Sequence, residues 1–331
     1  MKMYVIERYA PRDWPLVADL IRKWPFKPFR NHDLWHADHL ENLSLTRVNE
    51  ILKNPHVTAW VARHINKIVG FVTLTPLPWD SEQLGLPAAR LDYLIAHGTY
   101  NEELSIKENL IKSVLYFCSK EGVKHLSVRV DASDLSSIHV LEKLGFIMVD
   151  GILTFATKLN GNMPFILKEK IEKITIRVAE PSDSEAVAEL ARKSFIYDRF
   201  HSDPAIPKEL ADELHANWLR NSCSGKVADV VILAEDNQGI LGFVTCKLQK
   251  DTRKYLGKMV GTIVLIATAK RARRKGVGRA LTLAALDWFR QQGSDIVEVG
   301  TQLRNIPASR LYEGCGFRIV SSSVSLRRLI L

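Results

Sequence analysis

The chain lacks the features of a membrane protein or of a disulfide-stabilised secreted protein. No apolar run approaches the roughly 18–20 residues of a membrane span, and Lys2, Glu7 and Arg8 interrupt the start before an export signal could form. The four cysteines include no CxxC pair, which argues against a disulfide framework and a thiolate zinc site. We therefore expect a folded cytoplasmic protein without a membrane partner.

The composition is that of an ordinary globular protein, with 46% hydrophobic and 25% charged residues. A length of 331 residues suits two compact cores, because single domains cluster at about 100–200 residues. The formal net charge of +9 favours an anionic partner. Charge alone does not separate nucleic acid from phosphate or a phosphorylated cofactor.

The second half of the sequence repeats the first at a spacing of 171 residues. At this spacing Leu94-Ile95-Ala96 aligns with residues 265–267, and Gly145-Phe146 aligns with residues 316–317. Shifts of 170 and 172 align the front parts of the two halves as well. An internal repeat of this length indicates two copies of one fold in tandem.

The boundary between the copies is expected at 161–173, where asparagine, glycine and proline break regular structure. This leaves one domain at 1–160 and another at 174–331. Alternating strand and helix patterns predict an α/β fold with a mixed sheet. In the second copy we expect strands at 174–178, 230–235, 240–248, 262–268, 296–301 and 318–326, and helices at 185–193, 277–292 and 308–314.

A basic loop with two glycines follows the expected strand 262–268. Residues 270–279 read Lys-Arg-Ala-Arg-Arg-Lys-Gly-Val-Gly-Arg, so six of the ten are basic. Glycine permits close approach of the backbone, and the N–H groups and dipole at a helix start favour an anion. The loop therefore has the properties of a pyrophosphate site, although a solvated basic turn or a nucleic-acid patch would give a similar isolated pattern.

Together with its surroundings, the loop resembles the R-x-x-G-x-G signature of the GNAT acetyltransferases. Asn305, Ala308, Tyr312 and Gly316-Phe317 follow in the order and at the spacing of the other landmarks of that superfamily. The resemblance implies two tandem GNAT (acyl-CoA N-acyltransferase) domains, the second of which binds acetyl-CoA as cosubstrate.

The resemblance also assigns roles around the cofactor. The loop holds the CoA pyrophosphate in that family, and backbone groups of the preceding strand bind the pantetheine arm. The implied cofactor-binding residues are Ile266, Thr268, Arg273, Arg274, Lys275, Gly276, Val277, Gly278, Arg279 and Asn305.

The first copy lacks this loop. Carboxylates repel a pyrophosphate, and residues with a Cβ block the close backbone approach. We therefore expect residues 1–160 to form a degenerate GNAT-like domain without a CoA site. At a spacing of 171, the residues Glu102, Glu103, Ser105 and Lys107 replace Arg273, Arg274, Gly276 and Gly278.

Tyr312 stands on the expected helix 308–314 and by spacing alone would be a core aromatic. In GNAT enzymes a tyrosine at the matching position lies beside the CoA sulfur and protonates the departing thiolate. A phenol with a pKa of about 10 is a suitable donor to a thiolate whose acid has a pKa of about 8.5. The resemblance therefore makes Tyr312 the expected catalytic acid.

A closer resemblance concerns the acceptor. Tyr197–Pro204, Trp218 and 300–312 resemble the dTDP-fucosamine acetyltransferase family, which acetylates the 4-amine of a nucleotide-linked 4-amino-4,6-dideoxy sugar. The front half resembles the N-terminal domain of that family through Leu77–Glu82, but it is longer and more complete. The implied acceptor-binding residues are Tyr197, Arg199, His201 and Gln302.

Several alternatives stay open. The acceptor could instead be a protein N-terminus, a polyamine or an antibiotic, or the chain could be a non-catalytic module that binds CoA, RNA or an acidic protein. Residues 270–279 contain no aromatic side chain for base stacking, which disfavours nucleic acid. The oligomeric state is also open, with a homodimer as one alternative.

The general base is not assigned by the sequence, which offers Asp198, His201 and Glu235 as candidates. His32, His36 and His39 have helical spacing and could in principle bind a metal. No carboxylate or cysteine cluster accompanies these three histidines, so no metal site is expected.

Overall fold

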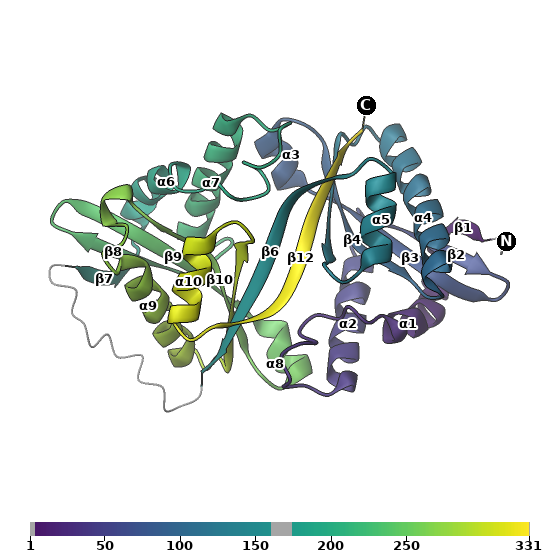
Figure 1. Cartoon of the computed structure of the whole chain (residues 1–331), viewed down its shortest axis with the longest axis horizontal. Helices are drawn as coiled ribbons and strands as arrows, with labels where there is room; N and C mark the ends of the chain where they lie inside the picture. Colours follow the sequence, from purple (N-terminus) through teal and green to yellow (C-terminus); the bar gives the residue numbers. More distant parts are fainter. Residues whose placement is uncertain (1–3, 160–173, 331) are drawn as a thin grey trace. The chain divides into compact units, whose positions relative to one another are not determined.

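The computed structural model describes residues 4–159 and 174–330 (Figure 1). The expected linker at 161–173 lies outside the described residues. The chain divides into two compact units, the first with Met1–Gly151 and Ser322–Leu331, the second with Ile152–Ser321. None of the helices in the described ranges has the length and hydropathy needed to cross a membrane.

The first unit is a mixed sheet with helices on both faces. Side chains alternate between the faces of a strand, so Trp60 and Ala62 pack toward α4 and α5, and Ala59 and Val61 pack toward α1 and α2. Only the β4–β5 pair of this sheet is parallel among the described strands. In sheet order the strands are β1 (Val5–Arg8), β2 (Thr58–His64), β3 (Lys67–Pro76), β4 (Ala88–Ala96), β5 (His125–Asp131) and β12 (Arg318–Leu329); the helices are α1 (Trp14–Lys23), α2 (Ala37–Leu52), α3 (Pro78–Leu84), α4 (Tyr100–Lys120) and α5 (Leu135–Lys143).

The second unit repeats this architecture. One core layer packs the sheet against α9 and α10, and the other packs it against α6 and α7. In α9 the residues Val277, Leu281, Ala285 and Phe289 recur every four positions and are all buried, which gives the helix its apolar face. In sheet order the strands are β7 (Thr175–Val178), β8 (Val230–Asp236), β9 (Gly239–Gln249), β10 (Val260–Thr268), β11 (Ile296–Gln302) and β6 (Ile147–Lys158); the helices are α6 (Ser184–Arg192), α7 (Lys208–Cys223), α8 (Lys250–Leu256), α9 (Val277–Gln291) and α10 (Ile306–Gly314).

The expected α/β fold with mixed sheets is confirmed, and the strands and helices expected in the second copy are found with ends shifted by up to three residues. Helices α7 and α8 were not among the expected elements. In α7 the apolar face is interrupted by a buried histidine, His215, which weakens the helical pattern in the sequence.

Each sheet is completed by a strand from the other half of the sequence. Residues 152–158 of β6 pair with β11, and residues 323–329 of β12 pair with β5. Phe155 is therefore buried in the core of the second unit, whereas Leu326, 171 residues later, is buried in the core of the first. The expected division at 160 and 174 differs from the compact units at these two strands. The sequence does not reveal the exchange, because each strand takes the place of its equivalent and the spacing of the repeat is preserved.

The strand exchange predicts where a core mutation in β6 or β12 lowers stability. A mutation in β6 should destabilise the second unit, and a mutation in β12 should destabilise the first. We expect Phe155→Ala to destabilise the second unit by about 3–5 kcal/mol, because it leaves a large cavity beside Tyr312. In hydrogen-exchange mass spectrometry, the loss of protection should appear in α9 and α10. Leu326→Ala is the matched control, and its loss of protection should appear in α4 and α5. Faster hydrogen exchange confined to α4 and α5 in Phe155→Ala would contradict the strand exchange.

Candidate active site

The two central strands of the second unit separate part-way along their length. Strands β10 and β11 are in parallel register from Val260 to Ile263, opposite Ile296 to Val299. The register of β10 with β9 shifts between Ile263 and Leu265, and that pairing then continues to Thr268. The edge of β10 beyond Ile263 is therefore no longer paired with β11.

The backbone groups of Ile266 and Thr268 point toward this unpaired edge. Ala269 donates its N–H to the carbonyl of Leu241 on the β9 side. Alternate residues of a strand direct their N–H and C=O groups to opposite edges, so Ile266 and Thr268 direct theirs away from β9. An extended amide-containing ligand could bind here as an additional strand.

The loop after β10 leads directly into the N-terminus of α9. Arg274 and Gly276 have positive φ values of 61° and 81°, and Gly276 immediately precedes the first helical residue. A Cβ at Gly278 would lie 3.2 Å from Leu311 Cδ2, so α10 packs closely on the first turn of α9. The first N–H groups of α9 have no partner within the helix, and the helix dipole there favours an anion.

Five of the six basic residues of the loop fall into two groups. Arg271 forms an ion pair with Asp236, with N–O distances of 2.6 and 3.0 Å, and Arg279 donates to the carbonyl of Gly314 at 2.7 Å. Within the parts of the chain that the structure describes, no ion pair engages the three exposed cations next to the helix start. These three are Arg273, Arg274 and Lys275.

The corresponding position in the first unit is closed by its own side chains. Helix α4 begins at Tyr100, so the positions equivalent to the basic loop are helical. Glu102 accepts from the N–H of Thr99 at 2.8 Å and completes a capping box. Lys107, at the position of Gly278, is buried, and its Nζ lies 2.8 Å from Asp134 Oδ1. The N-terminus of α4 is thus already capped, and a buried ion pair occupies the position of the close glycine.

Tyr312 lies on α10, one residue after the leucine that contacts the first turn of α9. Its ring centroid is 5.8 Å from that of Phe155 and 5.9 Å from that of Phe317, and the side chain is buried. Burial raises the pKa of Tyr312 well above the usual value of a phenol. The hydroxyl therefore stays protonated at neutral and moderately alkaline pH and has a proton to donate.

The segment between α6 and α7 lies beside the loop between β11 and α10. Arg304 donates to the hydroxyl of Ser202 and, at 3.4 Å, to the carbonyl of Tyr197, and its guanidinium lies 6.0 Å from the tyrosine ring centroid. Gln302 is the last residue of β11, two positions earlier. The structure therefore brings Tyr197 close to the β11 end that carries Gln302. Sequence reasoning missed Arg304, although its position between Gln302 and Asn305 could have indicated it.

Asn305 and Arg199 have local partners. The Asn305 side chain caps α10 and accepts from the N–H of Ala308 at 3.4 Å. The guanidinium of Arg199 lies over the ring of Phe200, 4.4 Å from its centroid. Neither contact by itself shows a ligand-binding role.

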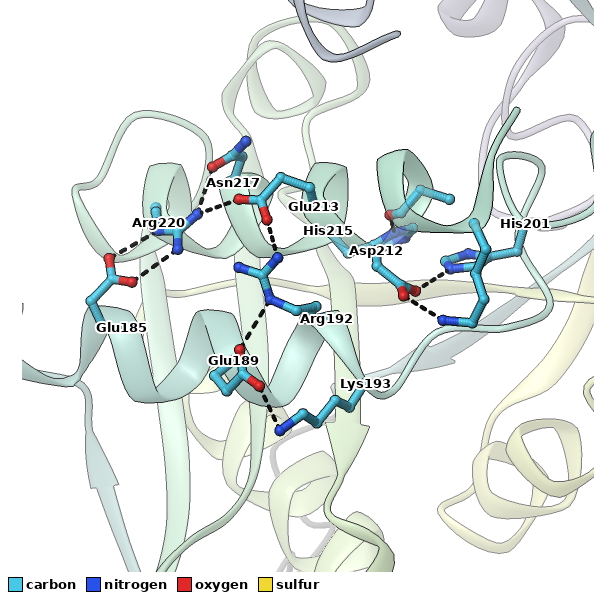
Figure 2. Close-up of polar contacts among 12 residues, drawn as sticks. Glu185, Glu189, Arg192, Lys193, His201, Asp212, Glu213, His215, Asn217 and Arg220 are labelled. Atoms are coloured by element: carbon cyan, nitrogen blue, oxygen red, sulfur yellow. Dashed lines mark hydrogen bonds and ion pairs between the residues drawn. The ribbon is translucent and has the colours of Figure 1, made fainter. Parts of the chain in front are cut away.

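All three candidate bases are engaged by other side chains. Glu235 accepts from Arg177 at 2.9 and 2.8 Å. His201 lies between two carboxylates. Its Nδ1 is 2.6 Å from Asp198 Oδ2, and its Nε2 is 2.9 Å from Asp212 Oδ1; Figure 2 shows the contact with Asp212. Burial opposes a charge on the ring, but the two carboxylates together raise the pKa of His201 above its ordinary value. Asp212 is a partner that sequence reasoning missed, because it lies on the unpredicted helix α7.

A family model now decides the identity of the fold. The model of the acetyltransferase (GNAT) family matches residues 14–146 and 185–317, once in each half. The chain belongs to the GNAT acetyltransferase family. It is an N-acetyltransferase, and the family uses acetyl-CoA as its acetyl donor.

Individual relatives and a solved structure resemble the chain over much of its length. The chain is 26% identical over 286 residues to the spore coat polysaccharide biosynthesis protein SpsD of Bacillus subtilis (strain 168), covering 84% of this chain and 92% of that protein. It is 24% identical over 204 residues to the dTDP-fucosamine acetyltransferase of Escherichia coli O6:H1, covering 61% of this chain and 81% of that protein. A solved tandem GNAT protein from the clavulanic acid biosynthesis pathway aligns over 99% of both chains with a TM-score of 0.56 and 14% identity, a likeness of fold.

The residues of the second GNAT domain fit acetyl-CoA. The glycine at the start of α9 and the exposed cations beside it suit the pyrophosphate, which binds helix N-termini through backbone N–H groups. The unpaired edge of β10 suits the amides of the pantetheine arm. The first GNAT domain has the same separation of strands, since its parallel ladder ends at Leu91, but its helix start is capped.

We expect Gly276→Glu to weaken acetyl-CoA binding by about 100-fold or more, because it places bulk and negative charge where the pyrophosphate would lie. Isothermal titration calorimetry with acetyl-CoA measures the change. Gly257→Glu is the matched control: this glycine also has a positive φ, of 68°, and ends α8. Both variants add the same charge and similar backbone strain, so equal affinities in the two would refute the assignment of the loop.

Proposed function

We infer that the second GNAT domain acetylates the amine of a nucleotide-linked amino sugar. The observation that carries this inference is the contact of Arg304 with Tyr197 and Ser202, which holds the segment Tyr197–Pro204 beside the end of β11. This segment resembles the dTDP-fucosamine acetyltransferases, and one relative bears that name. A second relative is named for polysaccharide biosynthesis, which supports a sugar acceptor.

The chemistry needs an acetyl donor and two contributions from the protein. Acetyl-CoA supplies the acetyl group as a thioester. A backbone N–H at the unpaired edge of β10 donates to the thioester carbonyl and stabilises the negative charge that develops there. The amine nitrogen forms a bond to the carbonyl carbon, the C–S bond breaks, and the hydroxyl of Tyr312 gives its proton to the sulfur.

The amine must also lose a proton. Glu235 is held in an ion pair with Arg177, and Asp198 is engaged by the ring of His201 at 2.6 Å. The raised pKa of His201 favours its charged form, so none of the three is suited to accept the proton. We therefore propose that the proton leaves through water, and that the residues of the acceptor segment position the sugar. Tyr197, Arg199 and Gln302 remain the proposed acceptor-side residues, and His201 contributes by holding the segment through Asp198 and Asp212.

We expect Tyr312→Phe to lower kcat by about 10²–10⁴-fold with the Kd of acetyl-CoA nearly unchanged, because only the proton donor is removed. Steady-state kinetics with a dTDP-linked 4-amino-4,6-dideoxy sugar would measure this. Tyr93→Phe is the matched control, since it removes the hydroxyl of a partly buried tyrosine from the first unit; burial raises the pKa of Tyr93 to about 12. Full turnover in Tyr312→Phe would exclude its acid role.

The chemical class of the acceptor is tested by comparing kcat/KM for different amines. The amino sugar should give a kcat/KM well above those of a polyamine, an aminoglycoside and a peptide with a free N-terminus. A higher kcat/KM for any of these three would refute the sugar acceptor and leave the acetyltransferase assignment intact.

A further inference from the structure

Two histidines and an aspartate converge in the second unit, away from the basic loop. Asp198 and His201 lie between α6 and α7, and His215 lies on α7. One nitrogen or oxygen from each lies within 4.8 Å of the other two. The side chains are only 13%, 5% and 3% exposed, respectively.

The other ring nitrogen of each histidine is held by a hydrogen bond. His215 Nδ1 lies 2.8 Å from the carbonyl of Ala211, which can only accept, so Nδ1 carries the proton. His201 Nε2 lies 2.9 Å from Asp212 Oδ1. Figure 2 shows His201, Asp212 and His215 in this arrangement. Bonds of this kind to carbonyls and carboxylates orient histidines that bind metals, because they direct the second nitrogen toward the ion.

The remaining contact is unfavourable in the absence of a cation. His215 Nε2 is 3.7 Å from Asp198 Oδ2, beyond hydrogen-bond distance. In a neutral ring this nitrogen carries a lone pair, so it faces a carboxylate oxygen in a buried position. The ring of His215 is also fixed from its sides: Phe195 stacks on it with centroids 4.5 Å apart, and Trp218 is nearly parallel to it at 6.2 Å.

We propose that Asp198, His201 and His215 bind a divalent transition-metal ion, with zinc as the ion favoured by their chemistry. Two imidazole nitrogens and one carboxylate oxygen form a common ligand set for zinc, with water as the fourth ligand. The ion replaces the proton between His201 and Asp198 and separates His215 Nε2 from the carboxylate. It ties α7 to the segment that contains Tyr197.

The competing arrangement is metal-free. In it a charged His201 donates to both Asp198 and Asp212, and the cluster is an ion-pair network like the neighbouring one of Arg192, Glu213 and Arg220 (Figure 2). This arrangement gives both ring nitrogens of His201 a hydrogen-bond partner, but it leaves His215 Nε2 facing the carboxylate of Asp198. The two arrangements differ in whether the cluster binds a metal.

The full-length chain, stripped with a chelator and dialysed, is titrated with Co²⁺ and then with Zn²⁺. We expect one Co²⁺ per chain, with visible absorption bands of a low-symmetry nitrogen and oxygen site that one equivalent of Zn²⁺ removes. Asp198→Asn and His215→Gln should lose at least about 100-fold in Zn²⁺ affinity, since each removes a ligand. His125→Gln, a control at a comparably buried histidine of the first unit, should keep wild-type affinity.

Asp212→Asn tests the site without removing a ligand, in case the variants at the buried ligands fail to fold. Asp212 binds no metal in this arrangement but holds the His201 ring, so its loss should weaken Zn²⁺ binding by about 10–100-fold. Circular dichroism checks that each variant is folded. The absence of a stoichiometric site in the wild-type chain, or equal Zn²⁺ affinity in wild type, Asp212→Asn and Asp198→Asn, would overturn the proposal. Either result would leave the acetyltransferase assignment untouched.

Discussion

The proposed pyrophosphate site at α9 depends on keeping the N–H groups at the start of that helix free of side-chain partners. Gly276 brings the backbone into a left-handed conformation without a side chain, and the three adjacent cations are exposed. The first unit shows what happens when this constraint is lifted. There the helix extends further toward its N-terminus, Glu102 caps it, and Lys107 forms a buried ion pair. A few side chains therefore decide whether the helix start in this fold is open or closed.

The exchanged strands couple each unit to the other half of the sequence. Phe155 comes from the first sequence repeat, yet its ring packs against Tyr312 in the second unit. The proposed catalytic acid has to be held in place by its surroundings, and part of that support is encoded far away in the chain. The first half of the sequence therefore contributes a strand to the core of the second unit.

The parts that the sequence could predict are those with local causes. Gly276, Gly278 and the basic residues define the loop by themselves, and the helix that follows has a regular apolar face. The strand exchange is invisible in the sequence, because Phe155 and Leu326 are equivalent positions of the repeat. The cluster around His215 also escaped prediction, since the buried histidine interrupts the apolar pattern of α7 and its partners lie up to 17 residues away.

The central claim is that only the second of two similar domains binds acetyl-CoA. Isothermal titration calorimetry of the full-length chain with acetyl-CoA tests it most directly, because the method counts sites. The account predicts one site per chain. Two equivalent sites per chain would show that the capped helix of the first unit also accepts the cofactor, and would contradict the account.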